Sequence, residues 1–156
     1  MRVAVGCDHA GYPMKGVVLD AISASGHQPV DCGTHTSAPV DYPDYASKVA
    51  RAILEGRADR GVILCGSGVG AAVAANKIRG IRAGLCHDHY SAHQGVEHDD
   101  LNVLCLGARI VGPSVAAELV AAFLGAHFTG EERHARRMAK VHRLEQTQQP
   151  FPEAES

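Results

Sequence analysis

The chain has 156 residues, of which 46% are hydrophobic and 21% are charged, with 15 lysines and arginines against 17 aspartates and glutamates. This length and composition are typical of one globular domain that needs neither disulfides nor a structural metal. The formal charge of −2 excludes a strongly basic nucleic-acid binder, and no apolar run approaches the roughly 20 residues of a membrane helix. The five cysteines are scattered and the N-terminus does not resemble a signal peptide, so we expect a cytoplasmic protein.

Five short apolar segments, each followed by glycine or polar residues, predict β-strands. Runs such as Val3 to Val5 are continuously apolar, which is typical of parallel strands that are covered on both faces. Helical spacing lies between them, as in Tyr45, Val49 and Ala52 or in the stretch that begins at Pro113. The alternation predicts a three-layer α/β/α sandwich around a five-stranded, parallel, Rossmann-like sheet, within one domain of residues 1–149. The predicted strands are residues 2–6, 27–32, 60–65, 81–86 and 102–107.

The C-terminal segment differs in composition from the rest of the chain. Residues 130–149 predict a charged helix whose apolar stripe, formed by Met138, Val141 and Leu144, is thin. Such a helix buries little against its own domain, so we expect it to pack on a partner subunit. Residues 150–156 are predicted to form a disordered end.

Candidate binding residues follow the predicted strands, because ligands of an open parallel sheet bind beyond the carboxyl ends of its strands. The first strand is followed by Asp8 and His9. Asp8 also suits a structural role as a helix cap. An adjacent acid and histidine exceed what a cap needs, so both are candidate site residues.

The third predicted strand ends in Cys65, and the glycine-rich sequence G-S-G-V-G follows. These glycines permit a tight turn whose N–H groups point outward at a helix start, which predicts an anion site. A thiol beside such N–H groups is stabilised as the thiolate, so Cys65 is a candidate base or nucleophile. The alternative is a small buried strand residue, as expected for Cys32, Cys86 and Cys105.

The same loop has a second interpretation as a nucleotide site. It lacks the Lys-Ser/Thr of a Walker loop, but Gly66, Gly68 and Ala71 match a dinucleotide fingerprint, with Asp88 at a suitable distance for a ribose hydroxyl. That fingerprint belongs after the first strand of a fold, whereas this one follows the third.

Histidines and arginines supply the other candidates. His89 and His93 are spaced to share a helix face and bind a metal, although no third ligand is specified. His98, followed by Asp99, is predicted in a loop just before the fifth strand and is a candidate for acid–base chemistry. Arg133 and Arg137 are one helical turn apart, and with Arg109 they supply enough positive charge to hold a phosphate.

In combination, these motifs resemble the type B ribose-5-phosphate isomerases and their relatives that act on galactose 6-phosphate and allose 6-phosphate. The resemblance covers residues 2 to about 143. It implies a phosphorylated sugar as substrate, no metal or other cofactor, and a homodimer or dimer of dimers whose active sites are shared between chains. It rests on the motifs G-C-D-H-A-G, D-Y-P-D-Y-A, C-G-S-G-V-G, A-A-N-K, G-I-R-A, N-V-L-C-L-G-A-R and R-H-A-R-R.

The same resemblance implies a role for each site residue. Cys65 moves a proton between C1 and C2 of the open-chain sugar, Ser67 assists it, and His98 opens the sugar ring. The backbone of the glycine loop holds the enediolate, and some phosphate contacts come from the neighbouring chain. The implied substrate contacts are Gly66, Ser67, Gly68, Val69, Gly70, Asp8, His9, Asp99, Arg109, Arg133 and Arg137.

One residue departs from the usual family pattern. The family commonly has His-Asn where this sequence has His98-Asp99, and an ionised aspartate cannot donate a hydrogen bond as an amide does. We expect an isomerase that interconverts ribose 5-phosphate and ribulose 5-phosphate through a cis-enediolate. The alternatives are an isomerase of galactose 6-phosphate, allose 6-phosphate or a tetrose phosphate, a nucleotide-binding regulatory module that uses residues 66–71, and a metal-dependent hydride-shift isomerase.

Overall fold

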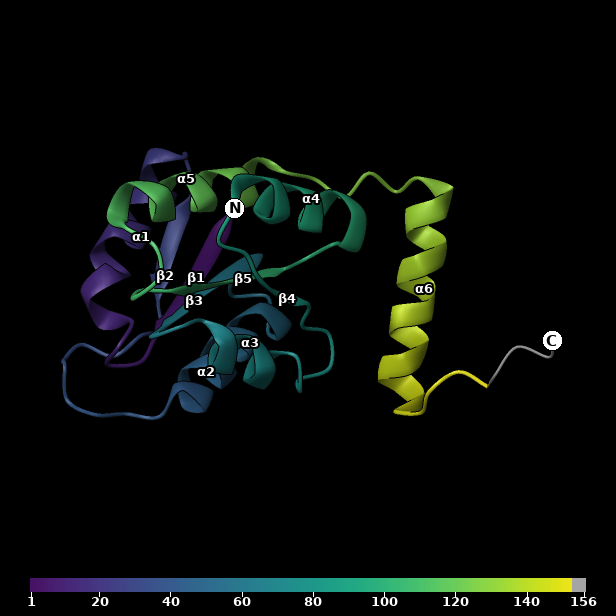
Figure 1. Ribbon diagram of the computed structural model, residues 1–156, viewed down its shortest axis with the longest axis horizontal. Helices are drawn as coiled ribbons and strands as arrows, with labels where there is room; N and C mark the ends of the chain where they lie inside the picture. Colours follow the sequence, from purple (N-terminus) through teal and green to yellow (C-terminus); the bar gives the residue numbers. More distant parts are fainter. Residues whose placement is uncertain (153–156) are drawn as a thin grey trace.

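The computed structural model describes residues 1–152 and has a five-stranded parallel sheet at its centre (Figure 1). The strand order is β2-β1-β3-β5-β4, and every neighbouring pair is parallel. The predicted α/β sandwich is therefore confirmed. The strands are β1 (Arg2–Cys7), β2 (Gln28–Asp31), β3 (Arg60–Cys65), β4 (Ala83–Leu85) and β5 (Val103–Gly107).

Helices cover both faces of the sheet (Figure 1). In β1, Val3 and Val5 belong to the apolar core on one face, whereas Ala4 belongs to the core on the other face. This alternation follows from the two-residue period of a strand, and burial of both faces explains why the central strands are continuously apolar. The first face carries α1 (Tyr12–Ala24), α4 (His89–Asp99) and α5 (Pro113–Gly125), and the second carries α2 (Tyr42–Leu54) and α3 (Val69–Ala75).

The edge strand β4 is shorter than the predicted segment 81–86. Its free edge is bound by a side chain, because Ala83 N–H donates to Asn76 Oδ1 at 2.8 Å and Asn76 Nδ2 donates to the Ala83 carbonyl at 2.9 Å. Before it, Arg82 N–H donates to Asn102 Oδ1 at 2.8 Å. In the predicted segment 81–86, hydrogen bonds to the Asn76 and Asn102 side chains thus replace part of the expected strand-to-strand pairing.

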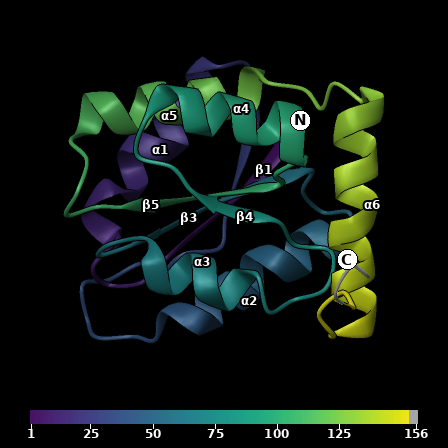
Figure 2. The same cartoon turned by 45° about the vertical axis from the view of Figure 1, so that its right-hand side comes forward.

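Helix α6 (Glu132–Thr147) stands apart from the sandwich at the end of the molecule where β1 begins (Figures 1 and 2). Its contacts with the rest of the chain include the buried side chains of His134 and Met138 and a hydrogen bond from Gly80 N–H to Glu145 Oε1 at 2.7 Å. Val141 and Leu144, from the predicted apolar stripe, are 44% and 38% exposed. The stripe is therefore only partly covered by its own chain.

The segment after α6 was predicted to be disordered from residue 150. The Phe151 ring lies 5.8 Å from Lys140 Nζ and 5.9 Å from Arg143 Cζ. The remainder of that prediction, residues 153–156, lies outside the described residues. Within the described part of the chain, no helix has the length and apolarity required to cross a membrane.

Candidate active site

A cavity of about 390 Å³ opens at the carboxyl edge of the sheet, beyond the ends of β1, β3 and β5. This is where the strand-end argument placed a ligand site. The cavity brings together seven of the predicted site residues with three further residues. Its lining consists of Asp8, His9, Ala10, Tyr42, Cys65, Gly66, Ser67, Gly70, Arg109 and Ile110.

The loop after β3 surrounds the Cys65 sulfur with main-chain donors. Cys65 is 4% exposed, and the N–H of Gly68 donates to its Sγ at 3.1 Å. Gly68 has φ of +80°, a conformation that favours glycine and turns this N–H back toward the sulfur. A directed N–H group stabilises negative charge on sulfur. Cys65 therefore lies beside both the cavity and a main-chain donor.

Three neighbouring N–H groups of this loop make no hydrogen bond to the sulfur. The N–H of Val69 donates to Ser67 Oγ at 3.3 Å, which holds the Ser67 hydroxyl at the start of α3. Within residues 1–152, the N–H groups of Gly66 and Ser67 have no hydrogen-bond partner. They remain available to a negatively charged oxygen of a ligand.

The four other cysteines have a structural role, as small buried or partly buried side chains. Burial raises the pKa of Cys7 to about 11, and it also raises the pKa values of Cys32, Cys86 and Cys105. A buried thiol without a compensating donor stays protonated. None of these four sulfurs belongs to the cavity lining.

Asp8 and His9 line the same cavity from the end of β1, the strand next to β3. Asp8 is 6% exposed, and its Oδ1 accepts the Gly11 N–H at 2.8 Å, so it caps the turn that begins α1 as well as lining the cavity. His9 Nδ1 lies 3.2 Å from the nitrogen and 3.1 Å from the oxygen of Val40. This contact fastens the loop of residues 32–41 to the site.

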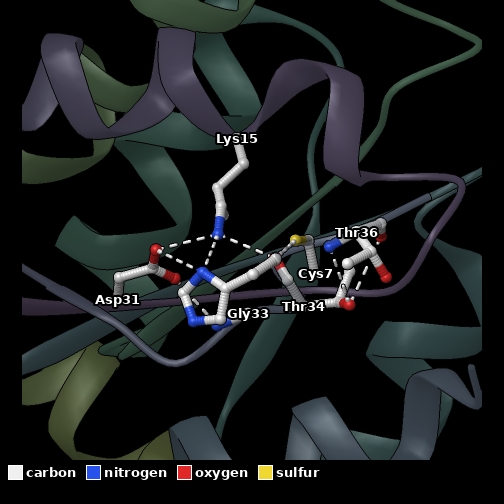
Figure 3. A network of polar contacts seen from close by, with 7 residues as sticks. Cys7, Lys15, Asp31, Gly33, Thr34 and Thr36 are labelled. Carbon is white, nitrogen blue, oxygen red and sulfur yellow. Dashed lines mark hydrogen bonds and ion pairs between the residues drawn. The ribbon is translucent and has the colours of Figure 1, made fainter. Parts of the chain in front are cut away.

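The other end of that loop is fixed by a buried lysine (Figure 3). Lys15 Nζ donates to Asp31 Oδ2 at 2.8 Å, to the Thr34 carbonyl at 2.7 Å and to His35 Nδ1 at 3.3 Å. The lysine side chain is 8% exposed, so all three ammonium protons are used inside the protein. The network holds the loop that leads to Tyr42.

We expect Lys15→Met to lower the free energy of unfolding by about 3 kcal/mol, because it leaves Asp31 and the Thr34 carbonyl without their charged partner. Urea denaturation followed by far-ultraviolet circular dichroism measures this change. Lys77→Met is the control, since Lys77 is exposed, and we expect a change within about 0.5 kcal/mol. Equal stability of the two variants would show that the buried network contributes nothing.

Tyr42 is a lining residue that sequence analysis did not select. Its ring covers Gly70 so closely that a Cβ at Gly70 would lie 2.8 Å from Tyr42 Cζ. The signal was present in the motif D-Y-P-D-Y-A, but nothing in the sequence indicates that the long loop after β2 returns to the end of β3. Ala10 and Ile110, which directly follow the predicted residues His9 and Arg109, were not selected because their side chains are apolar and carry no chemical signal.

Arg109 brings positive charge to the glycine loop. Its N–H donates to the Gly66 carbonyl at 3.0 Å, and its guanidinium carbon would lie 3.6 Å from a Cβ at Gly66. The prediction that Arg109 faces the same ligand as Cys65 therefore has a geometric basis.

Gly68 and Val69 belong to the glycine loop, whereas the four other predicted residues lie at the opposite end of the sheet, where the strands begin. His98 is in the last turn of α4 and not in a loop, so that placement was wrong. Helix α4 runs antiparallel to the strands, so His98 and Asp99 lie near the start of β5. The cavity lies beyond the other end of this five-residue strand, which spans about 16 Å. Arg133 and Arg137 are exposed residues of α6, the helix that lies at this end of the molecule (Figure 2). One chain therefore does not gather all three arginines around one phosphate.

The residues that suggested a dinucleotide site or a metal site have other contacts in the structure. Asp88 accepts the Ser91 N–H at 2.7 Å as the cap of α4, and this hydrogen bond lowers the pKa of Asp88. His89 and His93 share a helix face as predicted, but His93 Nδ1 lies 3.3 Å from Glu97 Oε2. Among the described residues, no group of three or more His, Cys, Asp or Glu side chains is arranged to hold a metal ion.

The profile of the ribose/galactose isomerase family matches residues 3–141, and the chain belongs to this family. It is 43% identical over 145 residues to ribose-5-phosphate isomerase B of Escherichia coli, covering 93% of this chain and 97% of that protein. It is 39% identical over 132 residues to D-erythrulose-4-phosphate isomerase of Pectobacterium atrosepticum, covering 83% and 86%. The solved structure of type B ribose 5-phosphate isomerase from Leishmania infantum matches with a TM-score of 0.92 at 42% identity, covering 95% and 98%.

Proposed function

We propose that this protein is a type B ribose-5-phosphate isomerase that interconverts ribose 5-phosphate and ribulose 5-phosphate. The observation that carries the proposal is the Cys65 sulfur at the cavity, with the Gly68 N–H at 3.1 Å and the Arg109 guanidinium beside the same loop. The similarity to ribose-5-phosphate isomerase B over nearly the whole chain supports the same substrate. All five cysteines are free thiols, which supports a cytoplasmic location.

The proposed reaction is a proton transfer between adjacent carbons. The Cys65 thiolate removes the proton from C2 of the open-chain aldose, and the electron pair moves through the new C1–C2 double bond onto O1. The same thiol then returns a proton to C1 while O2 loses its proton and becomes the ketone oxygen. Ser67, which also lines the cavity, assists the proton exchange between the two oxygens.

The glycine loop supplies the stabilisation that this step requires. The unpartnered N–H groups of Gly66 and Ser67 are the proposed donors to the enediolate oxygens. Val69 and Gly70 continue this loop into the first turn of α3. Removing one such donor typically lowers turnover by about 100- to 1,000-fold. The loop geometry is therefore as important as the base.

We infer that a second copy of the chain completes each site. His98, Asp99, Arg133 and Arg137 lie at the end of the sheet opposite the cavity, which supports a role at the ligand of another chain. Exposed apolar side chains support a subunit contact around the cavity and on α6. These are Ile110 at the cavity, Val69, Val73, Leu85 and Tyr90 on α3, β4 and α4, and Val141 and Leu144 on α6.

In this arrangement the phosphate is held from both sides. His9 and Arg109 approach it from the chain that provides Cys65, and Arg133 and Arg137 approach it from the partner. We expect Arg137→Ala to raise KM by about 10- to 100-fold with kcat within threefold, since a charged hydrogen bond contributes about 1.5 to 3 kcal/mol. Initial rates and inhibition by inorganic phosphate measure the effect. Arg136→Ala, also exposed on α6, is the control, and equal KM values for both variants would contradict the phosphate role.

A tetrose phosphate is the second candidate substrate, favoured by Asp99 and by the similarity to D-erythrulose-4-phosphate isomerase. A panel of ribose 5-phosphate, erythrose 4-phosphate, allose 6-phosphate and galactose 6-phosphate separates these possibilities. We expect the highest kcat/KM for ribose 5-phosphate. A higher value for erythrose 4-phosphate would replace the proposed substrate while keeping the proposed chemistry.

A further inference from the structure

A buried histidine links α6 to the end of α4. His134 is 1% exposed. Its Nε2 is the only buried side-chain nitrogen or oxygen among the described residues that has no hydrogen-bond partner. Its Nδ1 lies 2.8 Å from Thr129 Oγ1. A buried polar atom without a partner is costly, so its presence calls for a functional explanation.

The surrounding hydrogen bonds define the protonation of this ring. Thr129 Oγ1 donates its only proton to the Glu97 carbonyl at 3.2 Å, so it accepts from His134 Nδ1–H. Nδ1 therefore carries a proton. Burial lowers the pKa of His134, and the nearby charges of His98 and Arg133 lower it further. His134 is held as a neutral imidazole.

This neutral ring stacks on His98. The ring centroids are 3.9 Å apart with an angle of 30° between the planes. On the other side, Gln94 Nε2 lies 2.6 Å from His98 Nδ1. An amide nitrogen donates, so His98 Nδ1 accepts and its proton sits on Nε2. No partner for that Nε2–H is found in the described chain, which leaves it free to meet a ligand.

We propose that His134 is a positioning residue for His98, holding that ring by stacking so that its Nε2–H is presented to the ring oxygen of the sugar in the partner's site. This inference rests on the proposed function, in which His98 opens the ring. Two imidazoles at 3.9 Å resist carrying charge together. His98 is the member of this pair whose ring carries an N–H group without a partner in the described chain, so it is the one that meets the sugar.

Two reactions separate ring opening from proton transfer. Conversion of ribose 5-phosphate begins from a closed furanose and needs both steps. Ribulose 5-phosphate cannot close to a furanose, because its O5 carries the phosphate. Exchange of its C1 hydrogen with deuterium oxide therefore needs Cys65 but not His98. A purely structural role of His134 in holding α6 would affect both reactions together.

The test compares two replacements at saturating substrate. His134→Asn keeps a donor to Thr129 but loses the stacked ring, and we expect about 10- to 100-fold slower conversion of ribose 5-phosphate. Deuterium exchange at C1 of ribulose 5-phosphate is expected to stay within about threefold of the unmodified protein. His134→Phe restores the stacked ring without the N–H, and we expect it to recover most of the lost conversion. His142→Asn, exposed on the same helix, is the control.

An equal fall in conversion and exchange, or unchanged conversion in His134→Asn, would overturn the proposal. If His134→Asn does not fold, Thr129→Val provides the second test, because it removes the acceptor that fixes the ring and is expected to show the same split between the two reactions. Failure of the proposed function itself would appear differently, as an unmodified protein that neither converts ribose 5-phosphate nor exchanges the C1 hydrogen.

Discussion

Cys65→Ala is expected to lower kcat for ribose 5-phosphate by about 1,000-fold or more, within the range that positioned acid–base groups contribute. The alanine methyl group cannot accept the C2 proton, whereas the glycine loop loses only the contact between Gly68 N–H and the sulfur. Initial rates of ketose formation measure the loss. Calorimetric titration with inorganic phosphate is expected to show binding within about threefold of the unmodified protein, since the arginines are retained.

The matched control is Cys105→Ala. Cys105 is fully buried in the strand next to β3 and contributes no atom to the cavity lining. Its loss is expected to cost stability with kcat nearly unchanged, as for other truncations of a buried side chain. A Cys65→Ala variant that retains turnover, or a Cys105→Ala variant that loses it to the same degree, would reject Cys65 as the base.

Mixing two inactive variants, Cys65→Ala and His98→Asn, is expected to restore about a quarter of the unmodified activity after subunits exchange. In an equal mixture half of the dimers contain one chain of each kind. Each such dimer has one site with an intact Cys65 from one chain and an intact His98 from the other, while its second site lacks both residues. Activity after co-refolding, measured against each variant refolded alone, gives the result.

The control for this experiment pairs Cys65→Ala with Arg109→Ala. Both residues line the same cavity of one chain. No mixed dimer then contains an intact site, so we expect no recovery. A gain of activity in this control, or no gain in the first mixture, would contradict sites that are shared between two chains.

The sheet was predictable because burial on both faces makes β1, β3 and β5 continuously apolar. The edge strand β4 was predicted too long, since the hydrogen bonds of Ala83 to the Asn76 side chain and of the preceding Arg82 to the Asn102 side chain leave no periodic signal. The carboxyl-edge rule also brought Cys65 and Arg109 to one cavity from separate strands. Local pattern and strand direction were sufficient for these features.

The positions of His98, Tyr42 and His134 depended on tertiary structure. His98 was expected in a loop because the α4 sequence is too polar to show where the helix ends. Tyr42 reaches the cavity through a loop whose course is fixed by the contact between His9 and Val40 and by the Lys15 network. His134 lies among charged residues that predict exposure, yet its stacking on His98 buries it.

The most direct test of Cys65 as the proton-transferring base is the isomerisation of ribose 5-phosphate in deuterium oxide, with the position of the label read by nuclear magnetic resonance. We predict deuterium at C1 of ribulose 5-phosphate, and at C2 of the ribose 5-phosphate re-formed from it, with no label from Cys65→Ala. Product that forms without label, or equal labelling by the alanine variant, would contradict proton transfer by Cys65.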